Sequence, residues 1–281
     1  MTTDARGITD QTFTAPDFFD AALYEPVFPE RVLAAVRPDR RLDLGDVVTW
    51  VEPCLELQNL GPGECFVLLA DLLPLADGSG GIPHRSLVED TVCSILALGI
   101  DPERCVIYRQ SDVPHVFELM WILAHHLGGD DADGHGAGGA SAPLLRAAEI
   151  LGIRATRVVT DRGPEAQRGP RLARSLARRL NARYDAALLP VPASDPLPVL
   201  ADEATVRAGR EPTRSREAGV LERIAESRER YGWLAAQRTL PSEILAEGAR
   251  RARSEAAEAV AVIKEAVARG DRAQDGREAR A

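Results

Sequence analysis

The sequence predicts an α/β fold in which a parallel sheet carries helices on both faces, followed by a small helical C-terminal domain. Strand-like and helix-like segments alternate before residue 128, which is typical of a parallel sheet with crossover helices. Segments rich in Gly, Pro or polar residues interrupt the chain at residues 128–143 and 190–215. Long, Ala-rich, periodic segments follow the second break and predict helices.

Three segments carry the prediction of the sheet and its helices. The run ECFVLLADLL, residues 64–73, is almost entirely apolar, as expected for a strand that is buried on both faces. The segment HRSLVEDTVCSILALGI, residues 84–100, has the apolar spacing of an amphipathic helix, and CVIYRQ, residues 105–110, predicts a second strand.

The breaks divide the chain into four predicted parts. These are an N-terminal extension (1–30), the sheet domain (31–189), a linker (190–216) and the helical domain (217–281). The first break contains a G-x-G-x-x-G string at Gly134, Gly136 and Gly139. No strand precedes this string and acidic residues flank it, so we interpret it as a loop and not as a dinucleotide site.

Composition excludes several classes of protein. The polar first residues have no apolar core of a secretory signal and no apolar run could span a bilayer, so we expect a cytoplasmic protein without a membrane partner. The four cysteines have no C-x-x-C spacing and the histidines have no ligand spacing, so we expect buried thiols and no metal. Lys264 is the only lysine among 34 Lys and Arg residues. Mechanisms that need a lysine elsewhere are therefore excluded.

Positive charge is concentrated in residues 146–184, which hold ten arginines and three acidic residues. Four of these arginines recur at helical spacing and predict one stripe, opposite a stripe of leucines: Arg168, Arg171, Arg174 and Arg178. The sequence leaves two interpretations of this stripe. It is either an ordinary solvated face or a contact surface for a polyanion or an acidic partner chain.

Five segments carry a resemblance to a known family. In chain order they are VRPDRRLDLGDVV, FVLLADLLPL, ALGIDPERCVIYRQSDVPHVFELMWIL, PLLRAAEIL and GPEAQRGPRLARSLARRLNARY. Together they resemble the tryptophanyl-tRNA synthetases, a family of class I aminoacyl-tRNA synthetases. The resemblance covers about residues 31–184 and implies a Rossmann-type domain, a helical C-terminal domain and a homodimer.

The resemblance implies a nucleotide site at positions where this chain is acidic. In the family's first signature, polar or imidazole side chains lie beside the ATP phosphates at a helix N-terminus. The matching positions here are Asp43, Gly45 and Asp46. A carboxylate about 4 Å from a phosphate costs on the order of 4 kcal/mol at an effective dielectric constant near 20. The family's second signature, K-M-S-K-S, has no counterpart, so we expect poor ATP binding and no cofactor.

The residues of the family's amino-acid pocket are matched more closely in this chain than those of its nucleotide site. The resemblance implies that Asp71, Gln110, Arg146, Glu149 and Glu165 line it, with Gln110 facing the ligand. Glu149 replaces the aspartate that binds the indole N–H, and Arg146 replaces a methionine. Arg146 and Glu149 also have the i, i+3 spacing of an ordinary surface ion pair, and both interpretations stay open. For Glu149→Ala we expect loss of ligand binding with little loss of stability.

These features favour a degenerate, shortened relative of the family that has lost ATP-dependent aminoacylation. It would keep a pocket for tryptophan or a related small aromatic or amino-acid ligand, in a specialised or regulatory role. Two alternatives remain. One is an enzyme that uses aminoacyl-tRNA or an activated amino acid, which makes tRNA a second candidate partner. The other is an active tryptophan-adenylating ligase in which arginines replace the lysines. The sequence assigns no catalytic residue.

Overall fold

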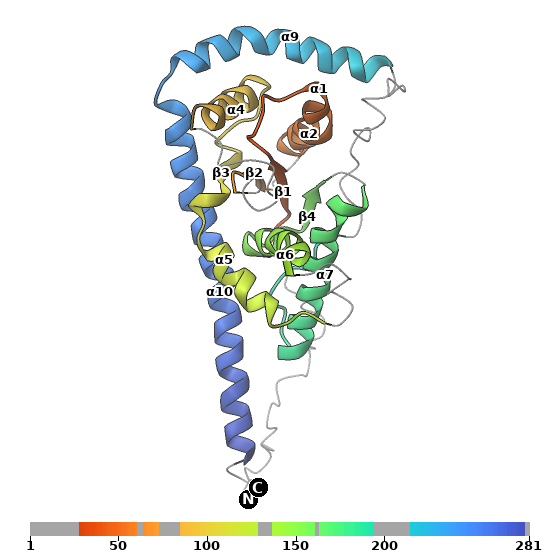
Figure 1. The fold of residues 1–281 in the computed structure, drawn as a ribbon, viewed down its shortest axis with the longest axis vertical. Coiled ribbons are helices and arrows are strands. Elements are labelled where there is room, and N and C mark those ends of the chain that lie inside the picture. Colours follow the sequence, from red (N-terminus) through yellow and green to blue (C-terminus); the bar gives the residue numbers. More distant parts are fainter. Residues whose placement is uncertain are drawn as a thin grey trace, which may run out of the picture.

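A four-stranded parallel sheet, in the order β3-β2-β1-β4, organises the molecule (Figure 1). The structure is a computed structural model that describes residues 28–60, 64–72, 85–128, 137–160, 163–193 and 214–278. The strands are β1 (Arg31–Val36), β2 (Glu64–Leu69), β3 (Cys105–Arg109) and β4 (Arg157–Val159). The predicted parallel sheet is confirmed, and both strands predicted from the sequence form its β2 and β3.

Alternating side chains of the strands feed two hydrophobic layers, one on each face of the sheet. Leu33, Phe66 and Tyr108 point into the layer that includes α5 (His115–Ala124), α6 (Ala137–Gly152) and α7 (Pro164–Tyr184). Val32, Val67 and Ile107 point into the opposite layer. That layer includes α2 (Glu52–Leu60) and α4 (Arg85–Ala97). The prediction of helices on both faces is therefore confirmed.

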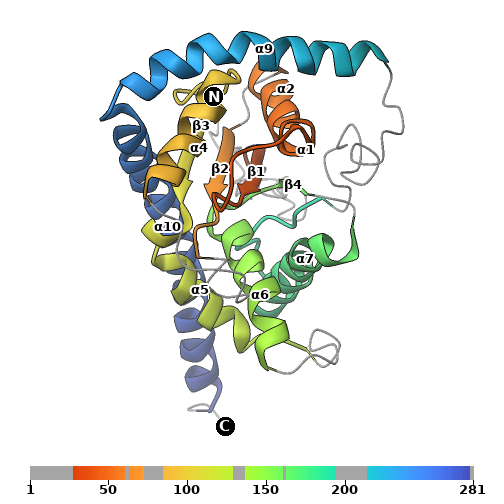
Figure 2. The ribbon, with the colours of Figure 1, turned by 45° about the horizontal axis from the view of Figure 1, so that its top comes forward.

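Two long C-terminal helices complete the fold. The helix α9 (Arg214–Ala236) crosses over α2 and α4, and α10 (Leu240–Glu278) runs past β3 (Figure 2). Leu245 of α10 joins one hydrophobic layer and Ala252 joins the other, so the helix covers the β3 edge of the sheet. The predicted C-terminal helices therefore share their core with the sheet.

Gly248 allows α10 to touch the edge strand directly. A Cβ atom placed on Gly248 would lie 1.9 Å from the carbonyl oxygen of Ile107 in β3, well inside van der Waals contact. Only a residue without a side chain fits at this crossing. The edge strand that leads into the site described below is therefore held by a backbone-to-backbone contact.

Two predicted boundaries change. The first break was expected to be a loop as far as Pro143, but α6 begins at Ala137 and contains Pro143. Alanine is the strongest helix former, and this segment contains several alanines. Leu144 and Ala147 are buried in the core, and this packing stabilises the helix although Pro143 cannot donate a backbone hydrogen bond. At the second break, α9 begins at Arg214, inside the predicted linker.

Parts of the earlier predictions lie outside the described residues. They include most of the N-terminal extension, Gly134 and Gly136 of the glycine string, and residues 194–213 of the linker. Within the described part of the chain, no helix has the length and apolar character needed to cross a membrane.

Candidate ligand-binding site

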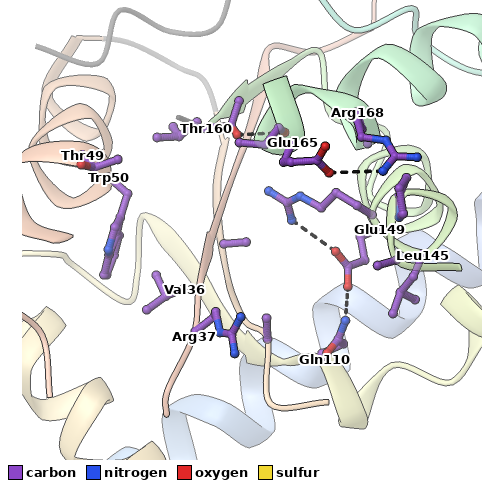
Figure 3. Close-up of a pocket in the computed structure, with 18 of the residues that line it drawn as sticks. Val36, Arg37, Thr49, Trp50, Gln110, Leu145, Glu149, Thr160, Glu165 and Arg168 are labelled. Atoms are coloured by element: carbon purple, nitrogen blue, oxygen red, sulfur yellow. Dashed lines mark hydrogen bonds and ion pairs between the residues drawn. The ribbon is translucent and has the colours of Figure 1, made fainter. Parts of the chain in front are cut away.

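A cavity of about 780 Å³ opens at the carboxyl ends of β1 and β4 (Figure 3). Val36 at the end of β1 and Val159 at the end of β4 both line it, and the other walls include residues of α6 and α7. The strand order places β2 on one side of β1 and β4 on the other. Open parallel sheets bind their ligands in crevices at such reversal points.

The buried end of the cavity is a hydrogen-bonded cluster of Gln110, Arg146 and Glu149. Gln110 begins the 3₁₀ turn η3 (Gln110–Asp112) after β3, and the other two residues lie one turn apart on α6. The Gln110 amide donates a hydrogen bond to Glu149 Oε1, and Arg146 Nη1 donates one to Glu149 Oε2 at 3.2 Å (Figure 3). Gln110 and Glu149 are only 3% and 4% exposed.

Burial dominates the electrostatics of Glu149. It raises the pKa of the carboxyl above its ordinary value, while Arg146 and the Gln110 amide act in the opposite direction. Burial also raises the pKa of the adjacent Tyr108, with the negative charge of Glu149 as the second cause. A carboxylate has lone pairs beyond those used by two donors. Glu149 can therefore still accept a hydrogen bond from a ligand.

Gly169 of α7 fixes the stem of Arg146. A Cβ atom placed on Gly169 would lie 2.6 Å from Arg146 Cβ and 2.5 Å from its Cγ. The contact involves the root of the arginine side chain, where little movement is available. The close approach of α6 and α7 at this glycine therefore sets the direction in which Arg146 leaves its helix.

Asp71 supports the turn that carries Gln110. Ser111 donates two hydrogen bonds to the Asp71 carboxylate, from its N at 3.0 Å and from its Oγ at 2.6 Å. The N–H of Leu72 donates to Gln110 Oε1 at 3.0 Å. Asp71 is not among the described residues that line the cavity. Gln110 and Glu149 therefore meet in the cavity as predicted. Asp71 was predicted to line the cavity as well, but its carboxylate instead holds the turn that carries Gln110.

The open end of the cavity holds the acidic positions of the first signature. Asp43 and Asp46 form a capping box on the short helix α1 (Leu44–Asp46), in which each carboxylate accepts the other residue's N–H. Arg40 donates two hydrogen bonds to Asp46, at 2.5 and 3.0 Å, and this contact raises the arginine pKa. Gly45 and Asp46 line the cavity, whereas Asp43 is absent from its described lining. Side chains of the protein therefore occupy the helix terminus that would face a phosphate.

The four arginines of α7 do not share one environment. Arg168 lines the cavity and pairs with Glu165 at 3.2 Å, and Arg174 donates to the Ala193 carbonyl at 3.0 Å. Arg171 and Arg178 are exposed. Arg168 and Arg174 are half-buried, so the four arginines of the predicted stripe differ in exposure, and its contact with a polyanion or a partner chain stays a prediction.

Sequence reasoning missed Thr49 and Trp50, which also line the cavity (Figure 3). They lie in the π-helical turn η2 (Val47–Val51). Thr49 Oγ1 and Trp50 Nε1 are buried, and within the described structure neither has a hydrogen-bond partner. Such turns are frequent at functional sites but depend on backbone geometry, so no residue pattern indicated this one.

In the described structure the four cysteines lie in the hydrophobic core and not among the residues that line the cavity. Cys54, Cys65, Cys93 and Cys105 are buried and free. Among the described residues, no three His, Cys, Asp or Glu side chains are arranged to hold a metal ion.

Curated proteins similar to this chain are tryptophan–tRNA ligases. The protein from Xanthomonas campestris pv. campestris is 31% identical over 175 residues, which cover 55% of this chain and 40% of the relative. The protein from Porphyromonas gingivalis is 32% identical over 183 residues, which cover 59% of this chain and 54% of the relative. The chain thus spans about half the length of these relatives. It matches no protein-family model.

Solved structures of the same class share the fold. Tryptophanyl-tRNA synthetase from Campylobacter jejuni aligns with a TM-score of 0.65 and 20% identity, over 86% of this chain and 100% of that one. The Mycoplasma pneumoniae enzyme gives 0.62 and 15%, over 85% and 97%. A second Campylobacter jejuni structure, complexed with ADP and tryptophan, gives 0.61. This chain is therefore similar in sequence to tryptophan–tRNA ligases over a little more than half of its length, and it shares the fold of tryptophanyl-tRNA synthetases.

Proposed function

We propose that this chain binds tryptophan or a related small aromatic or amino-acid ligand in the cavity and does not activate it with ATP. The buried cluster of Gln110, Arg146 and Glu149 carries the first half of the proposal. Burying polar side chains costs free energy, and here three of them face a cavity at the carboxyl end of a parallel sheet. Such a cluster is expected where a ligand is recognised. The tryptophanyl-tRNA synthetase from Campylobacter jejuni, which shares this fold, has been solved in complex with ADP and tryptophan.

The open end of the cavity supports the second half. Here the helix terminus is capped by Asp43 and Asp46, and Asp46 is paired with Arg40. A nucleotide phosphate would have to displace these pairs and then lie beside two carboxylates. Lys264, the single lysine, lies on α10 and pairs with Glu118. It therefore offers no charge to a transferring phosphoryl group at this site.

Two measurements on the purified full chain test the proposal. Calorimetric titration with L-tryptophan is expected to show binding, and tryptophan-dependent ATP–pyrophosphate exchange at millimolar ATP is expected to stay at background. An active tryptophanyl-tRNA synthetase run in parallel establishes that the exchange assay works. Robust exchange would overturn the loss of activation. Failure of L-tryptophan and of related aromatic amino acids to bind would overturn the ligand pocket.

The alternative proposal is that this chain uses aminoacyl-tRNA as a substrate, which would make tRNA a partner. The exposed Arg171 and Arg178 are the observation in its favour, because arginine forms bidentate contacts with phosphates. Fluorescence anisotropy with bulk tRNA at low and high salt distinguishes it from the first proposal. The homodimer stays a prediction, and light scattering after size exclusion would test it.

A further inference from the structure

Arg146 keeps most of its hydrogen-bonding capacity inside the cavity. A guanidinium carries five N–H donors. Within the described part of the chain, Arg146 makes one hydrogen bond, from Nη1 to Glu149. Its side chain is 20% exposed and lines the cavity. Donors in this position are available to a ligand that offers an acceptor.

The position of this guanidinium is built into the fold. Gly169 packs on the Cβ and Cγ of Arg146, and Glu149 holds the far end of the side chain. An arginine restrained at both ends loses little conformational freedom when it binds a ligand. It is therefore suited to selecting one ligand group over another and not merely to balancing charge.

The charges around the cavity favour an uncharged ligand group. The described lining includes four arginines and four acidic residues, and each belongs to an ion pair within the chain: Arg37–Asp39, Arg40–Asp46, Arg146–Glu149 and Arg168–Glu165. A ligand carboxylate at Arg146 would be attracted by the guanidinium but repelled by the Glu149 carboxylate beside it, so the two terms largely offset each other. The same holds for a ligand cation, and either charge would still lose its hydration, which an uncharged group does not.

We propose that Arg146 is a specificity-determining residue that selects ligands whose side chain is uncharged and ends in an oxygen acceptor, such as a ketone, an amide or a hydroxyl. The acceptor oxygen takes a hydrogen bond from the guanidinium N–H groups that Glu149 leaves unused. This inference rests on the proposed function, because it names the ligand class of the same cavity.

A matched series of phenylalanine derivatives tests this selection by calorimetric titration of the full chain. The 4-acetyl derivative carries a ketone, the 4-isopropyl derivative has nearly the same shape without an acceptor, and the 4-carboxy derivative adds a charge. For the wild type, the 4-acetyl compound is expected to bind about 10- to 100-fold more tightly than the 4-isopropyl compound, as for a hydrogen bond to a charged group. The 4-carboxy compound is expected to bind more weakly than the 4-acetyl compound.

Variants assign the preference to the arginine. Arg146→Met is expected to reduce the ratio of the 4-acetyl and 4-isopropyl affinities to about one, since the thioether donates no hydrogen bond. Arg146→Gln, which keeps an amide donor and can still bond Glu149, is expected to give an intermediate ratio and serves if the methionine variant folds poorly. Arg178→Met removes an exposed arginine of α7 that is not among the described residues of the cavity wall, and it is expected to leave the ratio unchanged.

The outcomes separate this inference from the proposed function. Equal affinities of the 4-acetyl and 4-isopropyl compounds for the wild type would overturn the inference and leave the ligand pocket intact. Tightest binding of the 4-carboxy compound would overturn the uncharged class, and a preference that survives in Arg146→Met would overturn the role of Arg146. Absence of binding by all three compounds and by L-tryptophan would overturn the proposed function itself.

Discussion

Two arginine–glutamate pairs line the same cavity and differ mainly in their exposure to water. Arg146 and Glu149 on α6 are three residues apart and meet at 3.2 Å, and Glu165 and Arg168 on α7 have the same spacing and distance. The side chain of Glu149 is 5% exposed, whereas that of Glu165 is 81% exposed. The two pairs are nearly equivalent as sequence patterns and their arginines are similarly exposed, at 20% and 27%, but their glutamates lie at opposite extremes of solvation.

Burial determines how much the same kind of ion pair contributes to stability. The α7 pair is screened by water and salt, so it contributes little to stability. The α6 pair must offset the desolvation of a carboxylate, and the amide of Gln110 is needed as a second partner. A buried, costly pair that faces a cavity is the pattern expected of a binding site, and the exposed pair is the pattern of a surface.

The largest effect is expected from Glu149→Ala. Removing this carboxylate leaves the Arg146 guanidinium and the buried Gln110 amide unpaired, which costs about 3–5 kcal/mol for a fully buried pair. Because Arg146 is 20% exposed and can draw water from the cavity, we expect about 2–3 kcal/mol of lost stability. Urea denaturation measures it.

This expectation replaces the one drawn from the sequence, where Glu149→Ala was to leave stability nearly unchanged. The burial of Glu149 and its two partners are the reason for the revision. Ligand binding is still expected to be lost. A variant as stable as the wild type would mean that the carboxylate is solvated in solution, and the comparison between the two pairs would then fail.

The pH dependence of stability gives a smaller and more specific effect. Because burial raises the Glu149 pKa, the folded state prefers the protonated carboxyl. The free energy of unfolding contributed by this group is therefore fully present below its ordinary pKa of 4.5 and decreases as the pH rises through the raised value. Glu149→Gln cannot titrate, so its stability relative to the wild type is expected to increase from about pH 4.5 toward pH 8.

Urea titrations at three pH values in that range measure this difference, with Glu229→Gln on the exposed surface of α9 as the control. A difference that is constant with pH, or that shifts in favour of the wild type at high pH, would show that Arg146 and Gln110 outweigh burial. The buried pair would then resemble the exposed one in its energetics.

The fold was predictable where periodicity and apolar runs are long. The run at residues 64–73 and the run at 105–110 became β2 and β3, and the helix expected at 84–100 became α4. Sequence reasoning did not single out β1 and β4 as strands. β4 has only three residues, too few for an alternation to be recognised. The start of α6 was missed because glycines and Pro143 obscure a helix that is held by packing.

The candidate site was predictable only through the resemblance. Gln110 and Glu149 meet as expected, because their positions match motifs whose counterparts converge. The sequence could not distinguish a surface ion pair from a buried one at Arg146 and Glu149, since the spacing i, i+3 is the same in both. Burial depends on the approach of α7 at Gly169, which is a tertiary contact and leaves no local pattern.

The smallest effect is expected from Glu165→Ala, the counterpart of Glu149→Ala in the exposed pair. Glu165 lies in the first turn of α7, where a negative charge is favourable, and its contact with Arg168 is an exposed ion pair. Each of these terms is worth at most about 1 kcal/mol at low ionic strength. Urea denaturation in 0.05 M and 1 M NaCl is the measurement.

The loss caused by Glu165→Ala should shrink at high salt because exposed charges are screened, whereas the loss caused by Glu149→Ala should not. A salt-independent loss above about 2 kcal/mol for Glu165→Ala would show that this carboxylate is also enclosed. The open wall of the cavity would then be closed in solution.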